Sequence, residues 1–296
     1  MPHIEGVSQE RIQVGDITLN VATAGPPDGP LVILLHGFPE FWYGWRHQIP
    51  YLAKLGFRVI APDQRGYNLS DKPKGVASYG IDILAADIAG LIEATGHSSA
   101  QIVGHDWGAA VGWWMALKQP ERCSRFVALN VPHPMVFQKT LLTSLSQMRK
   151  SWYMFFFQVP WLPESIATRN NFESGATMLQ KASRPGSFTD EELEHYREAW
   201  SQPGAVKGML GWYRALVRYP GRVKRRRLKV PTLLIWGCDD IALDRRMAAP
   251  SVELCNEGRL ELFEDATHFV QHDEPDRVNA LLGEFLELSP SEPAAS

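Results

Sequence analysis

The sequence has too few cysteines for a disulfide framework. Only three of its 296 residues are cysteine, Cys123, Cys238 and Cys255, and no two of them form a C-x-x-C pair. An odd and widely spaced set is typical of a protein from a reducing compartment, and it lacks the spacing of a zinc site. We therefore expect a cytoplasmic protein without a structural metal.

Long hydrophobic runs and an excess of charge are absent as well. The most apolar stretch, residues 152–162, contains Gln158 and Pro160 and falls short of the roughly 20 residues that cross a bilayer. The first residues, MPHIEGVSQERIQ, lack the apolar core of a signal peptide. The net charge is −3, and the one basic run, RVKRRRLK at 222–229, is typical of a solvated linker. We expect neither a membrane nor a nucleic-acid partner.

Short apolar runs alternate with helical periodicity along most of the chain. Residues 11–24 predict a hairpin of edge strands, and the tail, 289–296, predicts disorder. The remaining predicted strands are 31–35, 58–61, 101–103, 125–129, 231–236 and 259–263, and the predicted helices are 41–55, 81–95, 107–119 and 274–288. This alternation predicts the α/β class, with a mostly parallel central sheet and helices on both faces.

The alternation stops in one long interval. Residues 134–227 contain helical and aromatic-rich stretches but no segment typical of a buried strand. We therefore predict a helical cap at 133–227, inserted into a core domain made of 1–132 and 228–296. The sequence leaves the oligomeric state open between monomer and homodimer.

One strand-to-helix junction has the pattern of a nucleophile elbow, with Asp106 between Gly104 and Gly108. Serine is usual at this position and attacks acyl carbons. A carboxylate instead displaces a leaving group from an sp3 carbon and forms an alkyl ester, which water then hydrolyses. Asp106 as nucleophile therefore predicts an α/β-hydrolase that acts on epoxides or on carbon–halogen bonds.

Hydrolysis of such an ester needs a base and charge stabilisation. His268 and Asp240 each follow a predicted strand, and the order nucleophile, acid, histidine is that of this fold. Asp239 remains an alternative acid. The expected oxyanion donors are the amides of Trp107 and of Phe38, which precedes Pro39.

The two substrate classes need different partners for the leaving group. A halide needs N–H donors, whereas an epoxide oxygen needs a weak acid such as tyrosine, with an ordinary pKa near 10. The predicted cap contains Tyr153 and Tyr213, although composition alone favours a packing role for both.

Five segments together resemble the soluble type of α/β-hydrolase-fold epoxide hydrolase: HGFPEFWYGWRHQIP, PDQRGYNLSDKP, GHDWG, NVPHP and DATH. The resemblance spans about residues 10–288. It implies that Tyr153 and Tyr213 hold the epoxide oxygen, that Asp240 rather than Asp239 is the acid, and that no cofactor is needed. We also expect Trp107 and Pro39 to contact the substrate.

Related dehalogenases differ at informative positions. Haloalkane dehalogenases have Asn or Glu where this chain has Phe38, and fluoroacetate dehalogenases have a His-Trp pair where it has Trp152-Tyr153. A small-molecule epoxide is therefore the expected substrate, with a haloalkane or fluoroacetate-type dehalogenase as the alternative. A ligand-binding protein on a hydrolase fold is a third reading, disfavoured because all five catalytic candidates are present.

Overall fold

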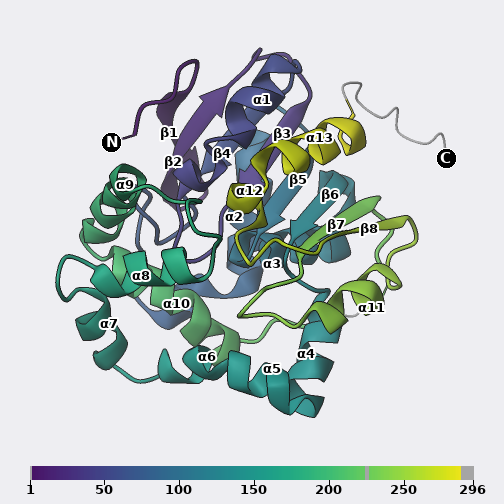
Figure 1. Cartoon of the computed structure of the whole chain (residues 1–296). Helices are drawn as coiled ribbons and strands as arrows, with labels where there is room; N and C mark the ends of the chain where they lie inside the picture. The colour runs from purple at the N-terminus through teal and green to yellow at the C-terminus, as the bar shows by residue number, and fades with distance from the viewer. Residues whose placement is uncertain (1, 224–226, 288–296) are drawn as a thin grey trace.

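The computed structural model describes residues 2–223 and 227–287, and one sheet of eight strands forms the centre of this part of the chain (Figure 1). The strands are β1 (Ser8–Val14), β2 (Ile17–Ala24), β3 (Leu31–Leu35), β4 (Arg58–Pro62), β5 (Ala100–His105), β6 (Cys123–Leu129), β7 (Thr232–Gly237) and β8 (Gly258–Phe263). Their order across the sheet is β1-β2-β4-β3-β5-β6-β7-β8. The predicted disordered tail and part of the basic run lie outside the described residues.

The predicted sheet is confirmed. β1 with β2 and β2 with β4 pair antiparallel, and the remaining pairs are parallel. Every residue of β3, β5 and β7 is buried, because helices cover both faces of a parallel sheet. The prediction that both strands of the first hairpin are edge strands was wrong for β2, whose second edge pairs with β4.

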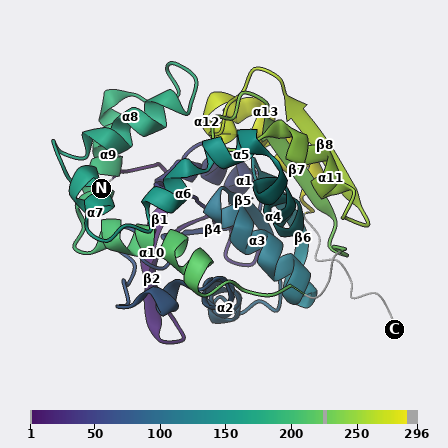
Figure 2. The same cartoon turned by 90° about the horizontal axis from the view of Figure 1, so that it is seen from below.

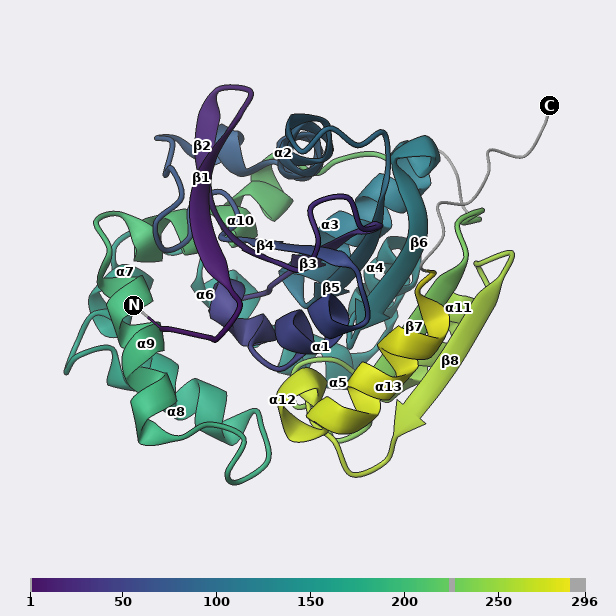
Figure 3. The ribbon, with the colours of Figure 1, turned by 90° about the horizontal axis from the view of Figure 1, so that it is seen from above.

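Helices cover the sheet on both sides. They are α1 (Gln48–Lys54), α2 (Ile81–Ala94), α3 (Trp107–Lys118), α11 (Ala248–Val252), α12 (Val270–Asp273) and α13 (Pro275–Phe285). α1 packs with α13, and α2 packs with α3 across the sheet from them (Figure 3). The helix predicted at 41–55 is instead a 3₁₀ turn, Trp42–Trp45, followed by α1. In a 3₁₀ turn the side chains at i and i+3 align, so both tryptophans reach the core.

The interruption predicted after β6 consists of helices. Between residues 134 and 223 the described chain forms seven helices and no strand. These cap helices are α4 (Pro134–Thr143), α5 (Leu145–Lys150), α6 (Trp152–Phe156), α7 (Leu162–Ala167), α8 (Glu173–Lys181), α9 (Asp190–Ser201) and α10 (Ala205–Arg218). They lie together at one side of the sheet (Figures 1 and 2). The domain boundaries at 132/133 and 227/228 stay a prediction. In the described ranges we find no helix with the length and hydropathy of a membrane span.

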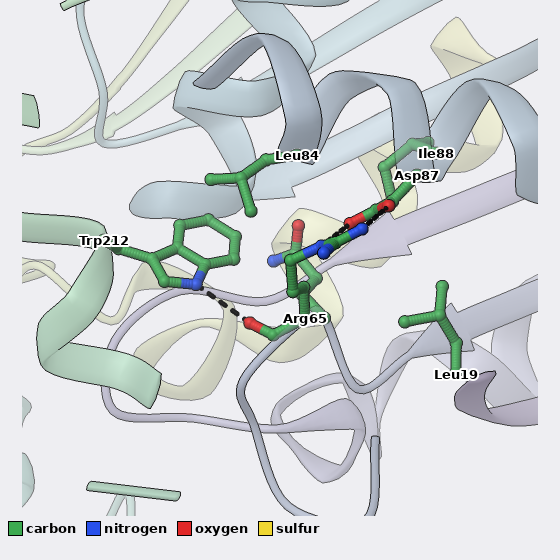
Figure 4. A pocket seen from close by; sticks show the side chains of 7 residues that line it. Leu19, Arg65, Leu84, Asp87, Ile88 and Trp212 are labelled. Atoms are coloured by element: carbon green, nitrogen blue, oxygen red, sulfur yellow. Dashed lines mark hydrogen bonds and ion pairs between the residues drawn. The ribbon is translucent and has the colours of Figure 1, made fainter. Parts of the chain in front are cut away.

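Two indole groups tie the cap helices to core loops. Trp212 of α10 donates to the carbonyl of Arg65 at 2.9 Å, beside a small hollow between α2 and α10 (Figure 4). The Arg65 guanidinium is fixed by two hydrogen bonds to Asp87 of α2, at 2.6 and 2.7 Å. Trp200 of α9 donates to the carbonyl of Pro39 at 2.6 Å. Both ties are buried, so they hold α9 and α10 over the loops that follow β3 and β4.

Candidate active site

The elbow between β5 and α3 raises the side chain of Asp106 above the sheet. Asp106 has φ of +49°, in the left-handed region that non-glycine residues rarely adopt. A Cβ on Gly104 would lie 2.5 Å from the carbonyl oxygen of Gly108, and one on Gly108 would lie 2.0 Å from that of Leu35. The turn therefore requires glycine at both flanking positions, as the sequence pattern predicted.

The two carboxylate oxygens of Asp106 face different partners. The Phe38 amide donates to Oδ1 at 2.8 Å, while Oδ2 lies 3.6 Å from Nε2 of His268. The structure thus places one of the two predicted oxyanion donors on the carboxylate. The role of the Trp107 amide stays a prediction.

Asp240 orients His268. Nδ1 of His268 donates to Oδ2 of Asp240 at 2.7 Å, which leaves Nε2 directed at Asp106. Asn130 donates to the same Asp240 oxygen at 2.8 Å, and two backbone amides, at 2.6 and 2.8 Å, hold the other. Asp239 is exposed, so the structure brings Asp240 and not its neighbour to the imidazole.

Asp240 and Asp106 change the protonation of His268. Burial by itself lowers the pKa of His268, but Asp240 and Asp106 outweigh it and raise that pKa to about 10. Burial likewise acts to raise the pKa of Asp106, whereas contact with His268 lowers it below its ordinary value. At neutral pH the resting site is therefore an imidazolium between two carboxylates. A reaction that neutralised Asp106 would remove part of the charge that holds this proton.

The two predicted tyrosines meet on the cap side of the elbow. Their ring centroids lie 5.8 Å apart at 80°, and the Tyr213 ring also lies 5.2 Å from Phe38 and 5.1 Å from Trp107. Burial and the charge of Asp106 raise the pKa of both hydroxyls. Both groups therefore remain protonated donors at neutral pH.

An apolar cavity of about 260 Å³ adjoins this site. It is lined by Phe38, Pro39, Trp152, Tyr153, Phe156, Phe157, Pro163, Ile166, Ala167, Phe172, Ser174, Gly175, Met178, Trp200, Val206, Met209 and Leu210. Most of the lining comes from α6 to α10. Of the two residues predicted to contact substrate, Pro39 lines the cavity, while Trp107 packs against Tyr213 and Trp212.

Sequence analysis missed a buried carboxylate behind the site. Glu40 is 1% exposed and accepts hydrogen bonds from His105 at 3.2 Å, Gln271 at 3.1 Å, Tyr196 at 3.0 Å and His272 at 2.7 Å. Burial raises the pKa of Glu40, but its histidine donors hold that pKa below the usual range. The carboxylate is thus charged and fully paired inside the protein.

This cluster reaches His268. Nε2 of His105 lies 2.9 Å from the backbone carbonyl of His268, and Nδ1 faces Glu40, so both nitrogens face acceptors. Tyr196 belongs to α9, which links the same carboxylate to the cap. The only sequence signal was a glutamate within the aromatic segment that follows Pro39. In the described ranges we find no group of three His, Cys, Asp or Glu residues suited to a metal ion.

Comparison with known proteins agrees with this geometry. Residues 30–275 match the family model described as alpha/beta hydrolase fold. The chain is 44% identical to AB hydrolase superfamily protein YfhM of Bacillus subtilis, over 96% of this chain and 99% of that protein. It is 39% identical to epoxide hydrolase 1 of Caenorhabditis elegans, over 96% of this chain and 71% of that protein. A crystal structure of Bacillus megaterium epoxide hydrolase with an inhibitor has a TM-score of 0.86 at 33% identity, covering 93% of this chain and 99% of that one.

Proposed function

The chain belongs to the α/β-hydrolase family, among its epoxide hydrolases, and we propose that it converts epoxides to vicinal diols through a covalent ester on Asp106. The observation that carries the proposal is the Asp106 carboxylate at the elbow. One backbone amide contacts it, and two protonated tyrosines, Tyr153 and Tyr213, lie on its cap side. A carboxylate suits attack on carbon, and a pair of phenols suits an oxygen that stays attached to the product.

Ring opening uses the two faces of this site. Oδ2 of Asp106 attacks an epoxide carbon from below, since Oδ1 is engaged by the Phe38 amide. The carbon–oxygen bond of the ring breaks, and Tyr153 and Tyr213 stabilise and protonate the departing oxygen. The product of this step is a hydroxyalkyl ester on Asp106.

Ester hydrolysis uses the histidine. Once Asp106 is esterified, one of the two charges that raise the pKa of His268 is gone, so the imidazole loses its proton more readily. His268, held by Asp240, then removes a proton from water, and hydroxide attacks the ester carbon of Asp106. The Phe38 amide stabilises the oxyanion on Oδ1. The proton that His268 gave up before this step restores the tyrosine that had protonated the epoxide oxygen. When the tetrahedral intermediate collapses, the leaving alkoxide takes the proton of the restored Asp106 carboxyl group, so the diol is released and the site returns to two carboxylates around a protonated His268.

The broader setting follows from the same residues. We propose that 133–227 acts as a cap domain that completes the pocket over a core of 1–132 and 228–296. The apolar lining of the cavity supports a small apolar epoxide as substrate. Three free cysteines support a reducing compartment such as the cytoplasm.

Isotope labelling of a single turnover tests the covalent route. With enzyme in excess over styrene oxide in heavy-oxygen water, we expect a diol free of solvent label and one labelled oxygen in the peptide that contains Asp106. This result follows because the oxygen added to the diol comes from the carboxylate. Mass spectrometry of the diol and of the digested protein measures both. Label in the first-turnover diol would overturn the covalent route, and halide release from haloalkanes without diol formation would favour the dehalogenase.

Loss of the cap hydroxyls is expected to slow ring opening. Tyr153→Phe or Tyr213→Phe leaves one donor and should reduce the rate modestly, whereas the double variant should lose roughly 10²- to 10⁴-fold, the usual contribution of a general acid. Stopped-flow measurement of ester formation separates this step from hydrolysis. Tyr43→Phe, which removes a hydroxyl outside the cavity lining, is the matched control. An unchanged rate in the double variant would contradict the assignment.

A further inference from the structure

The cap carries a large exposed apolar surface. Of the fifteen large hydrophobic side chains that are exposed among the described residues, nine lie between residues 142 and 166. We call them the cap patch: Leu142, Leu145, Met148, Trp152, Phe155, Val159, Trp161, Leu162 and Ile166. They come from α4 to α7 and the connections between them, which follow one another along the lower edge of the molecule in Figure 1. Large apolar side chains exposed on successive helices are typical of an interaction site.

Trp161 is the most exposed member, at 81%. Its φ is +61°, a left-handed conformation that is costly for a bulky residue. The chain therefore presents an indole to the outside at a position where neither burial nor backbone preference favours it. Tryptophan is enriched where proteins meet the interface of a bilayer.

The chain segment that carries the cap patch is basic. Residues 134–172 contain four basic side chains, Lys139, Arg149, Lys150 and Arg169, although the whole chain has a net charge of −3. Their one acidic side chain, Glu164, is paired with Arg214. In the described ranges Lys139, Arg149 and Arg169 are exposed and form no ion pair that would neutralise them.

The catalytic cavity reaches this surface. Trp152 and Ile166 belong to the cap patch, with Trp152 63% exposed, and both also line the cavity beside Tyr153. The helices that carry exposed tryptophan and leucine therefore also form the wall of the pocket. If a lipid layer covered the cap patch, an apolar compound dissolved in that layer would lie next to the cavity.

We propose that the cap patch binds peripherally to an anionic phospholipid surface, from which apolar epoxides enter the active site. Aromatic and leucine side chains enter the headgroup region, and the basic side chains contact the lipid phosphates. The sequence alone led us to expect no membrane partner, because it contains no span; a surface contact needs none. The delivery of substrate rests on the proposed function, whereas the surface contact does not.

A second copy of the chain fits the same surface less well. A twofold interface would place the patch against itself and bring the basic side chains of both copies together. A protein partner would also cover the cavity wall at Trp152 and Ile166, whereas a fluid bilayer dissolves apolar compounds, which match the apolar lining of the cavity.

Vesicle flotation tests the proposal. The wild type is mixed with vesicles of phosphatidylcholine alone or with about one third phosphatidylglycerol. A double variant, Leu145→Glu with Trp161→Glu, adds two charges within the patch at helix N-termini, where carboxylates are tolerated, and touches no cavity residue. The matched control, Leu55→Glu with Ile83→Glu, adds two charges at exposed apolar positions of the core. Circular dichroism shows whether the glutamate double variant folds. If it does not fold, a milder variant, Leu145→Ser with Trp161→Ser, takes its place.

We expect the wild type and the control to float with the anionic vesicles and the patch variants to bind about tenfold more weakly or less. Replacing Arg149 and Arg169 by glutamine should weaken binding roughly fivefold for each charge. All variants should hydrolyse a water-soluble epoxide at the wild-type rate. The patch variants alone should be slow on an apolar epoxide supplied in anionic vesicles.

Three results would overturn the proposal. They are a wild type that does not float, flotation that is equal in all variants, and a wild-type dimer in sedimentation velocity that the patch variants convert to monomer without any lipid binding. The last result would assign the patch to an interface between copies. Flotation needs no turnover, so an inert protein that floats would contradict the proposed function and leave the surface contact standing.

Discussion

Replacing Asp106 by asparagine is expected to abolish turnover, with a loss in kcat on the order of 10⁴-fold or more. The amide keeps the shape of the carboxylate and retains an oxygen for the Phe38 amide, but it cannot form an ester by attack on the epoxide. The tyrosines and the Phe38 amide remain in this variant, but they cannot replace the missing nucleophile. Steady-state diol formation from a broad epoxide panel measures the loss.

The chain provides a matched control for this variant. Asp239→Asn removes an exposed carboxylate next to Asp240 in the sequence, and we expect nearly wild-type rates because this side chain lies outside the site. Asp240→Asn should slow ester hydrolysis strongly, since it removes the charge that orients His268. If the Asp106 variant retained wild-type activity, or if Asp239 mattered more than Asp240, the site would be misassigned.

Replacing His268 by alanine is expected to trap the ester. Asp106 still opens the ring, but no base activates water, so the enzyme stops after one turnover with the mass of the epoxide added. Intact-protein mass spectrometry detects this species, and peptide mapping places it on Asp106. One equivalent of epoxide should disappear in a burst, followed by negligible turnover.

Two further variants are controls for this result. Asp106→Ala combined with His268→Ala should give no added mass, and His97→Ala should turn over normally, because His97 bonds only within its own turn. Continued turnover in the His268 variant, or an adduct that persists without Asp106, is inconsistent with the proposed roles.

Local patterns predicted most of the fold. Strands such as β3 and β7 are short apolar runs that only a doubly covered sheet can bury, so their sequence alone identifies them. The elbow was equally recognisable, because Gly104, Asp106 and Gly108 lie within five residues of the sequence. The glycine at 108 is required because its backbone comes so close to Leu35 that no side chain fits. His268 and Asp240 followed from one general rule, that parallel strands bring their carboxyl ends to the same edge.

Contacts between distant segments could not be predicted in the same way. Glu40 is bonded to partners from 65 to 232 positions away, and a lone glutamate in an aromatic segment says nothing of where they lie. The pairing of β2 with β4 depends on which of the later strands pairs with the second edge of β2, and the sequence of the hairpin does not determine this. The approach of Tyr153 and Tyr213 depends on how α6 and α10 pack, which helical periodicity does not determine.

The indole ties at Trp200 and Trp212 bear on how ligands exchange. A cap that swung away as a rigid lid would break both buried hydrogen bonds, to Pro39 and Arg65, in the same movement. The short helices α6 and α7 carry neither tie, so rotation of exposed lining side chains there, such as Trp152 and Ile166, would leave both ties intact. Such rotations take picoseconds to nanoseconds, far less than the microseconds to milliseconds of a hinge. Ligand exchange by this route would therefore need no hinge movement of the cap.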